Sequence, residues 1–364
     1  MRATELIHEN ICKGIVVSKR DLYYRDVVLF GSQLAVDNIA EDLACTLQVP
    51  RSCLNVVAGI RSMVYGSVRL VISARYQKTE SAKGTDDTCL NETSSRTAYN
   101  TLVVIPALMN DVLEIEIHPS TRFILVVEKE AAMEYLISSG FCSTHGPCIL
   151  LTSKGYPDKV VRQLLKYLSD MIDAGVHTFS PFPTPSRDVS FGSWGDLSSP
   201  GRQPPLDIPL LAFVDCDPHG IEIYLTYRCG SILSAYDNAN LAVPKLACLG
   251  QIPNDWNIYL TGEKSHLSDQ FQRLMITLSP RDRSKLVNML KQHPYVRRNR
   301  AWTRQISMML MMNRKTELES LSLSETCHEN LERGRDADDP MGQIGGDSLI
   351  QYLERKLQDP RLWI

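Results

Sequence analysis

Two aspartates separated by one residue follow an apolar stretch in the middle of the chain. The run LLAFV at 210–214 ends in Asp215 and Asp217, and a helix is expected to start near Ile221. A continuous apolar run of this kind is typical of a buried strand, and open α/β folds place ligands at the carboxyl edge of such strands. Because Mg²⁺ favours carboxylate oxygens, the pair predicts a metal site.

A third acid ends a second apolar run. Residues 123–127, FILVV, lead to Glu128, and a helical pattern follows. Between the acidic segments, CILLT at 148–152 passes through Lys154 and Gly155 into an amphipathic helix from Asp158 onward. An isolated Asp-x-Asp also occurs in phosphatases and glycosyltransferases. The order strand with Glu, strand with Lys-Gly, strand with Asp-x-Asp instead resembles a Toprim domain, the metal-binding fold of topoisomerases and bacterial primases.

Two adjacent tyrosines, Tyr23 and Tyr24, lie near the start of the chain in SKRDLYYRD. A phenol has a pKa near 10, so its attack on a phosphodiester needs a cation or base nearby. Arg20 lies four residues before Tyr24 and can share a helix face with it, while Ser18 and Asp21 have the spacing of a capping box. The residues alone do not decide which tyrosine reacts, and a pair of half-buried helix aromatics is the plain alternative.

These segments together resemble the family that comprises the meiotic double-strand-break protein Spo-eleven and its relative in topoisomerase VI, the A-type chain. The resemblance runs from about Ile15 to the carboxyl-terminal region and depends on four motifs in one order: SKRDLYYRD, ILVVEKEAA, LTSKGYPD and FVDCDPHGIEIY. Three later segments resemble helices of the family, and their residues alone indicate no chemistry: NLAVPKLACLG, LSPRDRSKLVNML and RKTELESL.

The resemblance implies a mixed α/β chain. A winged-helix (5Y-CAP-like) domain carrying the tyrosine is expected over 1–105, a Toprim domain with helical elaborations over 106–330, and an acidic segment with a carboxyl-terminal helix over 331–364. In the first domain the sequence predicts helices over 4–12 and 32–47, a third helix after Pro50, and a strand in RLVISARY. The polar stretch 78–98 and the Pro/Ser/Gly-rich stretch 179–205 are predicted loops, the second one mobile.

The resemblance implies that Tyr24 is the nucleophile, with Tyr23 as its packing neighbour and Arg20 stabilising charge. Tyr24 would attack a DNA phosphate, form a 5′-phosphotyrosyl link and release a 3′-hydroxyl, without nucleotide hydrolysis.

The resemblance also implies a ligand set and a set of DNA contacts. Mg²⁺ is expected on Glu128, Asp215 and Asp217, where it would neutralise charge on the phosphate and the departing oxygen. His219 is expected to play a supporting or structural role. DNA contacts are expected at Lys19, Arg20, Lys154 and Tyr156.

The implied partners are double-stranded DNA, a second copy of the chain that completes two composite active sites, a topoisomerase VI B-like subunit, and meiotic accessory proteins. Nuclear localisation follows, and no membrane association is expected. Two alternatives stay open: the A-type chain of an ATP-dependent type IIB topoisomerase, and a DNA-binding or dimerisation protein that does not cut. Relatives have a longer segment before the tyrosine motif, which docks the B-type subunit, and a glycine where Ser153 stands here.

The overall charge does not indicate a nucleic-acid binder. The chain has 364 residues, 43% of them hydrophobic, and a net charge of -3, so it can form two domains but must segregate its charges to bind DNA. Two basic groups meet this requirement: Lys13, Lys19, Arg20 and Arg25, and then Arg297, Arg298, Arg300 and Arg304. A solvated helix face explains the second group equally well.

The cysteine pattern points to reduced thiols. The ten cysteines include no Cys-x-x-Cys pair, which suits a nuclear or cytosolic protein. Cys142, His145 and Cys148 suggest a zinc site, but a fourth ligand is missing, so a chance grouping in a loop is the preferred interpretation. The sequence has no apolar run of about 18 residues and no phosphate-binding loop, so an ATP-driven gate would have to come from another protein.

Overall fold

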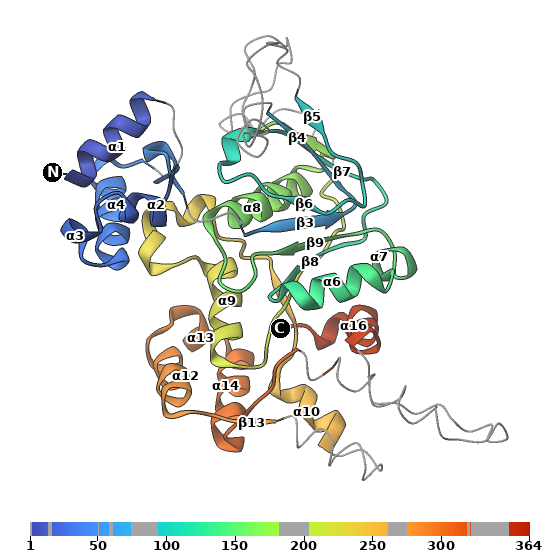
Figure 1. Cartoon of the computed structure of the whole chain (residues 1–364). Coiled ribbons are helices and arrows are strands. Elements are labelled where there is room, and N and C mark those ends of the chain that lie inside the picture. The colour runs from blue at the N-terminus through green and yellow to red at the C-terminus, as the bar shows by residue number, and fades with distance from the viewer. Residues whose placement is uncertain are drawn as a thin grey trace, which may run out of the picture. The chain divides into compact units, whose positions relative to one another are not determined.

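The computed structural model describes residues 2–13, 17–49, 51–57, 61–73, 94–181, 204–260, 275–318, 321 and 349–364 (Figure 1). These residues group into two compact units. The N-terminal unit comprises Met1–Arg122, Pro157–Ile208 and Gly230–Val243, and the carboxylate unit comprises Phe123–Tyr156, Pro209–Cys229 and Pro244–Ile364. The domain boundaries given above stay predictions.

Short helices around one apolar core form the first part of the N-terminal unit. Helix α1 (Arg2–Cys12) confirms the predicted helix, and α4 (Gln33–Leu47) starts after Ser32, whose hydroxyl accepts a hydrogen bond from the Ala35 N–H at 3.3 Å. Helix α2 (Lys19–Tyr24) packs against α4 and buries Leu22 in the core. The segment is completed by β1 (Val17–Ser18), α3 (Val27–Phe30), the 3₁₀ turn η1 (Arg51–Leu54) and β2 (Val56–Val57). The predicted third helix is therefore wrong, because residues 51–54 form only a 3₁₀ turn before strand β2.

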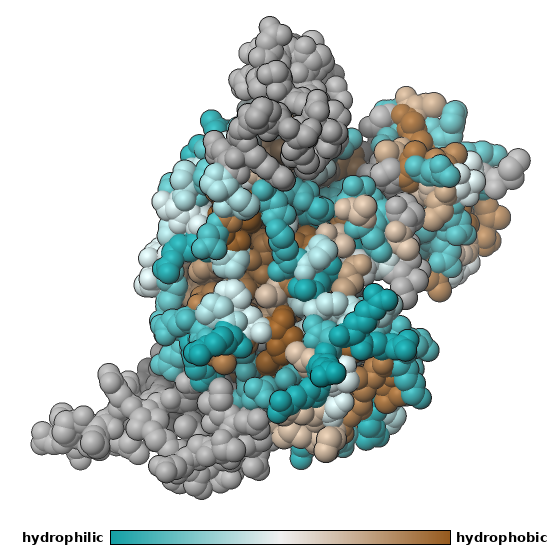
Figure 2. All heavy atoms as spheres, turned by 180° about the vertical axis from the view of Figure 1, so that it is seen from behind, coloured by the Kyte–Doolittle hydropathy of each residue, from teal (hydrophilic) through white to brown (hydrophobic). Residues whose placement is uncertain are grey.

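The surface of these helices carries exposed apolar side chains. Val28 of α3 is 97% exposed and Leu34 of α4 is 68% exposed. Hydrophobic residues accordingly lie on the outside of the N-terminal helices in Figure 2. Large apolar side chains gathered on a surface are a common mark of a protein interface.

Two small groups of antiparallel strands follow in the N-terminal unit. The first has the strand order β10-β7-β4-β5, and the second pairs β3 with β6. Strand β4 confirms the start of the strand predicted in RLVISARY, whose end lies outside the described residues.

Both predicted loops contain a short strand at one end: β5 pairs with β4 inside 78–98, and β10 pairs with β7 at the start of 179–205. Residues 74–93 and 182–203 lie outside the described part. The bounds are β3 (Met63–Gly66), β4 (Val68–Ile72), β5 (Ser95–Arg96), β6 (Val103–Val104), η2 (Met109–Asp111), β7 (Val112–Ile117), α8 (Lys159–Ala174), β10 (Thr178–Phe179) and η3 (Ile232–Asn240).

The carboxylate unit contains parallel strands in the order β12-β11-β8-β9. Their bounds are β8 (Phe123–Val127), β9 (Cys148–Thr152), β11 (Leu210–Phe213) and β12 (Ala247–Gly250), and every residue of β8, β9 and β11 is buried. The chain leaves β8 toward β9 on one side and leaves β11 toward β12 on the other. Neighbouring strands β8 and β11 thus form a topological switch point, the place where open α/β sheets bind ligands.

Helix α6 (Glu130–Ser138) packs against β8 and β9 of this sheet. Helix α8 begins at Lys159 with Asp158 as its N-cap, as predicted, and α12 confirms the helix predicted in LSPRDRSKLVNML. Two segments expected to be helical contain a strand: the last residues of NLAVPKLACLG form β12, and the first two residues of RKTELESL form β14, because each pairs with a neighbouring strand. The remaining bounds are α7 (Phe141–Thr144), α9 (Pro218–Cys229), α10 (Pro253–Leu260), β13 (Ile276–Thr277), α12 (Pro280–Gln292), α13 (Pro294–Arg298), α14 (Arg300–Met312), β14 (Arg314–Lys315), α16 (Leu349–Gln358) and η4 (Pro360–Leu362).

The end of the chain is described in part. Helix α16 confirms the predicted carboxyl-terminal helix, whereas the acidic segment before it falls in residues 322–348, outside the described residues. None of the helices in the described ranges has the length and apolar character needed to cross a membrane.

Candidate metal centre and nucleophile

Three acids lie at the switch point between β8 and β11. Val127 pairs with Phe213, and the Glu128 N–H donates to the Phe213 carbonyl at 3.0 Å, so the two strands end side by side. Glu128, Asp215 and Asp217 are 7%, 6% and 9% exposed. The structure therefore brings the two predicted acidic segments to the same edge of the sheet.

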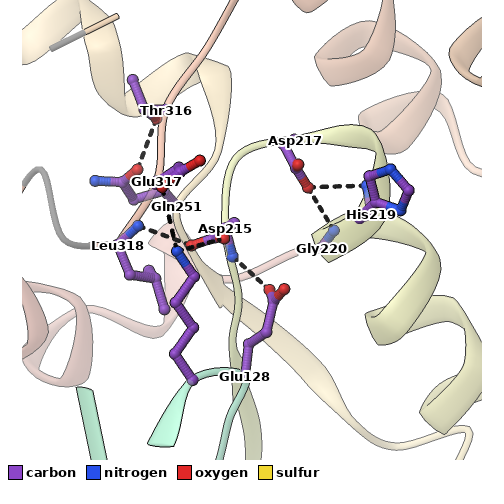
Figure 3. A network of polar contacts seen from close by, with 10 residues as sticks. Glu128, Asp215, Asp217, His219, Gly220, Gln251, Thr316, Glu317 and Leu318 are labelled. Atoms are coloured by element: carbon purple, nitrogen blue, oxygen red, sulfur yellow. Dashed lines mark hydrogen bonds and ion pairs between the residues drawn. The ribbon is translucent and has the colours of Figure 1, made fainter. Parts of the chain in front are cut away.

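Each carboxylate has a defined partner (Figure 3). Glu128 accepts a hydrogen bond from the Asp215 N–H at 2.9 Å, and Asp215 accepts one from the Leu318 N–H at 2.7 Å. The Lys129 ammonium lies 3.0 Å from the second oxygen of Asp215. These contacts hold the side chains of two different strand ends in one polar network.

Asp217 fixes the start of helix α9. Its Oδ1 accepts hydrogen bonds from the N–H groups of His219 at 2.8 Å and Gly220 at 2.7 Å. Because this side chain caps the first turn, the helix starts at Pro218, three residues before the predicted start near Ile221. Residue 220 has to be glycine, since a Cβ there would lie 2.3 Å from the Asp215 carbonyl oxygen.

Burial and mutual repulsion disfavour charge on Glu128 and Asp215. Burial raises the pKa of Glu128 to about 8, and the charge of Asp215 adds to the effect, while the hydrogen bond from the Asp215 N–H opposes it. Burial also raises the pKa of Asp215 to about 6, against the lowering effects of Lys129 and the Leu318 N–H. Buried carboxylates that repel one another favour a bound cation, which would relieve the repulsion.

The donor chemistry suits a hard divalent cation, whereas the present side-chain positions do not complete a site. Within the described ranges, no three His, Cys, Asp or Glu side chains are arranged to hold a metal ion. Each acid has an oxygen engaged with a backbone N–H, and Lys129 covers the other oxygen of Asp215. A cation shared by Glu128, Asp215 and Asp217 thus requires at least one side chain to turn, and the ligand set stays a prediction.

Lys129 and Glu317 are two charged residues of this centre that sequence reasoning missed. The Lys129 ammonium lies 3.5 Å from Glu317, within the segment RKTELESL, of which no chemistry was expected. Lys129 directly follows Glu128, so its position beside the strand end was open to prediction. The position of Glu317 could not be predicted from the sequence, because it depends on pairing between distant parts of the chain.

The turn after β9 carries two predicted DNA contacts. Lys154 has a φ of 56° and Gly155 a φ of 108°, and the Gly155 N–H donates to the Glu128 carbonyl at 2.9 Å. The Lys154 ammonium pairs with Glu130 at 2.6 Å. The turn is therefore anchored beside the end of β8.

Tyr156 joins a polar group next to Asp217. Its hydroxyl is 2.9 Å from His219 Nδ1 and 2.9 Å from the Lys285 ammonium, and it also donates to Glu222. Burial, reinforced by Glu222, raises the pKa of Tyr156, so this phenol stays protonated. Lys285, in LSPRDRSKLVNML, is another residue near the acids that the sequence did not single out.

The two tyrosines of α2 differ in environment. Tyr23 is partly buried against the apolar core of the N-terminal unit, whereas Tyr24 is 68% exposed, and their ring centroids are 5.5 Å apart. Arg20 is exposed on the same helix. Lys19, also a predicted DNA contact, lies 3.5 Å from Asp37 and is partly buried. Helix α2 starts directly after Ser18. The side chains of Ser18 and Asp21, the expected capping box, are not among those that the structure describes.

The suggested zinc ligands have other surroundings. His145 stacks on Phe141 with ring centroids 4.6 Å apart and contacts Glu354. The sulfur atoms of Cys142 and Cys148 lie 3.0 Å apart, and both residues are buried. His145 is therefore part of a packed surface between α7 and α16.

Two family models match the chain. The Toprim-domain model of the topoisomerase 6 A-type chains and Spo11 matches residues 123–182 and 203–329, and the model "Type IIB DNA topoisomerase" matches residues 1–56. The chain belongs to the Spo11/topoisomerase 6 A-type family. The Toprim match includes all three acids, and the second match includes both tyrosines. The predicted fold class, a mixed α/β chain with an amino-terminal winged-helix (5Y-CAP-like) domain followed by a Toprim domain, is thereby confirmed.

The similar proteins carry both family names. The chain is 30% identical over 323 residues to "Meiotic recombination protein SPO11" of Mus musculus, covering 89% of this chain and 66% of the relative. The human protein of the same name is 29% identical over 322 residues, which is 88% of this chain and 66% of the relative. The A3 chain of DNA topoisomerase 6 from Oryza sativa subsp. indica is 31% identical over 322 residues, 88% of this chain and 58% of that protein. The chain thus spans less than two thirds of the length of each.

Proposed function

We propose that the chain is a DNA-cleaving protein that breaks the DNA backbone by transesterification and so initiates meiotic recombination. The observation that carries the proposal is the combination of an exposed Tyr24 in the type IIB topoisomerase segment with buried acids at the Toprim switch point. The exposure of Tyr24, against the partial burial of Tyr23, supports the choice of nucleophile.

The reaction exchanges one ester for another. The Tyr24 oxygen attacks the phosphorus, its proton passes to solvent, and a bond forms between the phenolic oxygen and phosphorus. The bond from phosphorus to the 3′-oxygen breaks, and that oxygen leaves as a 3′-hydroxyl after taking a proton. Arg20, one helical turn before Tyr24, stabilises the phosphate charge in this step.

Glu128, Asp215 and Asp217 would hold Mg²⁺, and Lys154 and Tyr156 would contact DNA beside it. When bound, Mg²⁺ supplies charge neutralisation at the phosphate. The pKa of Glu128, about 8 without a cation, supports this assignment, because a divalent cation would relieve the buried repulsion at neutral pH.

A second copy of the chain is the proposed partner in cleavage, since breaking both strands needs two tyrosines. The exposed apolar residues of α3, Val27, Val28 and Leu29, directly follow the tyrosine helix and support a protein interface there. A B-type subunit, meiotic accessory proteins and nuclear localisation complete the proposal.

Strand passage is the second candidate function. The mouse SPO11 relative and the rice topoisomerase 6 relative are almost equally similar to this chain, at 30% and 31% identity. Sequence identity therefore does not distinguish a protein that only forms breaks from a type IIB topoisomerase that relaxes supercoils with ATP.

A denaturing gel tests the proposal. Radiolabelled duplex DNA is incubated with the chain, Mg²⁺ and a B-type subunit, and covalent adducts are resolved after denaturation. We expect an adduct that disappears with Tyr24→Phe and with EDTA but persists with Tyr23→Phe. ATP-driven relaxation of a plasmid in the same mixture would favour the topoisomerase. Absence of any adduct would indicate the alternative of a non-cutting DNA-binding protein.

A further inference from the structure

Lys129 is shared between a buried and an exposed carboxylate. Its ammonium lies 3.0 Å from Asp215 and 3.5 Å from Glu317. The side chain of Asp215 is 7% exposed, that of Lys129 is 25% exposed, and that of Glu317 is 47% exposed. The lysine therefore lies between the interior of the acidic centre and its rim.

Backbone contacts on both sides hold Glu317 at this rim. The Thr316 N–H donates to the Cys216 carbonyl at 3.1 Å, and the Leu318 N–H donates to Asp215 at 2.7 Å. The segment thus runs antiparallel beside residues 215–217. Glu317 is placed by this pairing, which gives the segment RKTELESL a role that its sequence alone did not reveal.

A divalent cation and the Lys129 ammonium compete for Asp215. Two positive groups at one carboxylate oxygen repel each other strongly in a partly buried site. If a cation occupies Asp215, the ammonium needs another acceptor, and Glu317 is already within 3.5 Å. A small rotation of the lysine side chain is therefore sufficient to exchange one carboxylate for the other.

We propose that Lys129 is a positioning residue that neutralises Asp215 before the cation binds, and that Glu317 receives Lys129 when the cation arrives. The pair thereby sets the cation affinity of the acidic centre. This inference depends on the proposed cation site. In this proposal Glu317 acts through Lys129, whose ammonium it contacts at 3.5 Å, and not as a ligand of the cation.

Binding of Mn²⁺ alone to the full chain, followed by electron paramagnetic resonance without DNA, tests the inference. Lys129→Gln removes the competitor, so we expect about 3- to 10-fold tighter binding, whereas Lys129→Arg keeps the wild-type affinity within about 2-fold. Glu317→Gln takes away the carboxylate that receives the displaced ammonium and should weaken binding by about 3- to 10-fold. The matched control is Lys315→Gln, which removes a positive charge two residues from Glu317 that pairs with Asp282 at 3.1 Å.

A double variant distinguishes a Glu317 that acts through Lys129 from a Glu317 that binds the cation directly. If Glu317 acts through Lys129, Lys129→Gln with Glu317→Gln binds Mn²⁺ as tightly as Lys129→Gln alone. Equal weakening by Glu317→Gln in both backgrounds would show that Glu317 is a direct ligand and overturn the inference. The inference would also be overturned if Lys129→Gln bound Mn²⁺ no more tightly than the wild type. The same holds if Lys315→Gln raised the Mn²⁺ affinity as much as Lys129→Gln does. If the wild-type chain binds no Mn²⁺ although its thermal unfolding is cooperative, the proposed cation site itself fails.

Discussion

At the residue scale, the acidic centre combines groups that destabilise one another when no cation is bound. Glu128 has a pKa of about 8 because burial and Asp215 oppose its charge. Lys129 covers Asp215, and Asp217 caps α9. The same acids that are expected to bind a cation therefore each have a structural partner in its absence.

The stability of the cation-free chain should decrease as pH rises. Between about 4.5, the ordinary pKa of a glutamate, and the folded value of about 8, folded Glu128 keeps a proton that the unfolded chain has lost. Raising the pH through this window therefore favours unfolding, and the protonated form stabilises the fold at low pH. Glu128→Gln stays neutral, so in EDTA it should be more stable than the wild type near pH 8, by at least about 1 kcal/mol.

Urea unfolding at several pH values in EDTA measures this effect. The control is Glu134→Gln, an exposed acid on α6, which should leave the pH dependence unchanged. A Glu128→Gln variant with the same decline toward pH 8 as the wild type would contradict the raised pKa.

At the element scale, the approach of helix α9 to the end of β11 determines the geometry of the acids. Gly220 lies against the backbone of Asp215, where a Cβ would be 2.3 Å from the carbonyl oxygen. No rotation of a side chain relieves a contact with backbone atoms. The helix can approach this closely only with glycine at that position.

Gly220→Ala should therefore destabilise the chain although alanine favours helices. We expect a loss of about 2–4 kcal/mol in the free energy of unfolding, from overpacking at the helix start. Thermal unfolding measures it, with Cys229→Ala, a partly buried position at the end of the same helix, as the control. A Gly220→Ala chain as stable as the wild type would show that α9 can move away without cost.

Sequence reasoning succeeded where local pattern decides structure. The runs before Glu128, Lys154 and Asp215 form buried parallel strands because each is continuously apolar. It failed where pairing between distant segments decides structure: β14 and β12 lie in segments expected to be helical. Glu317 lies near the acids because its neighbours Thr316 and Leu318 bond to Cys216 and Asp215. The start of α9 was misplaced because the capping role of Asp217 depends on its rotamer. The family motifs supplied the prediction that Tyr24 is the nucleophile, a choice that residue spacing had left open between Tyr23 and Tyr24.

At the scale of the whole molecule, positive charge is concentrated although the chain is slightly acidic. Asp282 and Glu317 are the only acids between 275 and 318, and Asp282 pairs with Lys315. Arg297, Arg298, Arg300 and Arg304 of α13 and α14 are all exposed. Arg300 lies at the amino-terminal end of α14, where positive charge opposes the helix dipole, so helix stability does not explain it.

We expect this basic group to contact DNA phosphates. In Arg300→Gln with Arg304→Gln, the slope of log affinity against log salt concentration should fall by about 1.8, because each lost phosphate contact contributes about 0.9. Fluorescence anisotropy with labelled duplex DNA at several salt concentrations measures the slope. Lys245→Gln with Arg361→Gln removes two exposed charges elsewhere in the carboxylate unit and should leave the slope unchanged. Equal slopes for both double variants would identify the group as a solvated helix face.

Mass-spectrometric assignment of the residue joined to DNA tests the central claim most directly. The adduct formed with Mg²⁺ in the presence of a B-type subunit is digested with nuclease and protease, and the peptide containing SKRDLYYRD is fragmented to locate the remaining nucleotide. The proposed mechanism predicts a nucleotide linked through its 5′-phosphate to Tyr24, the exposed member of the pair. A nucleotide on Tyr23, or on a residue outside α2, would contradict it.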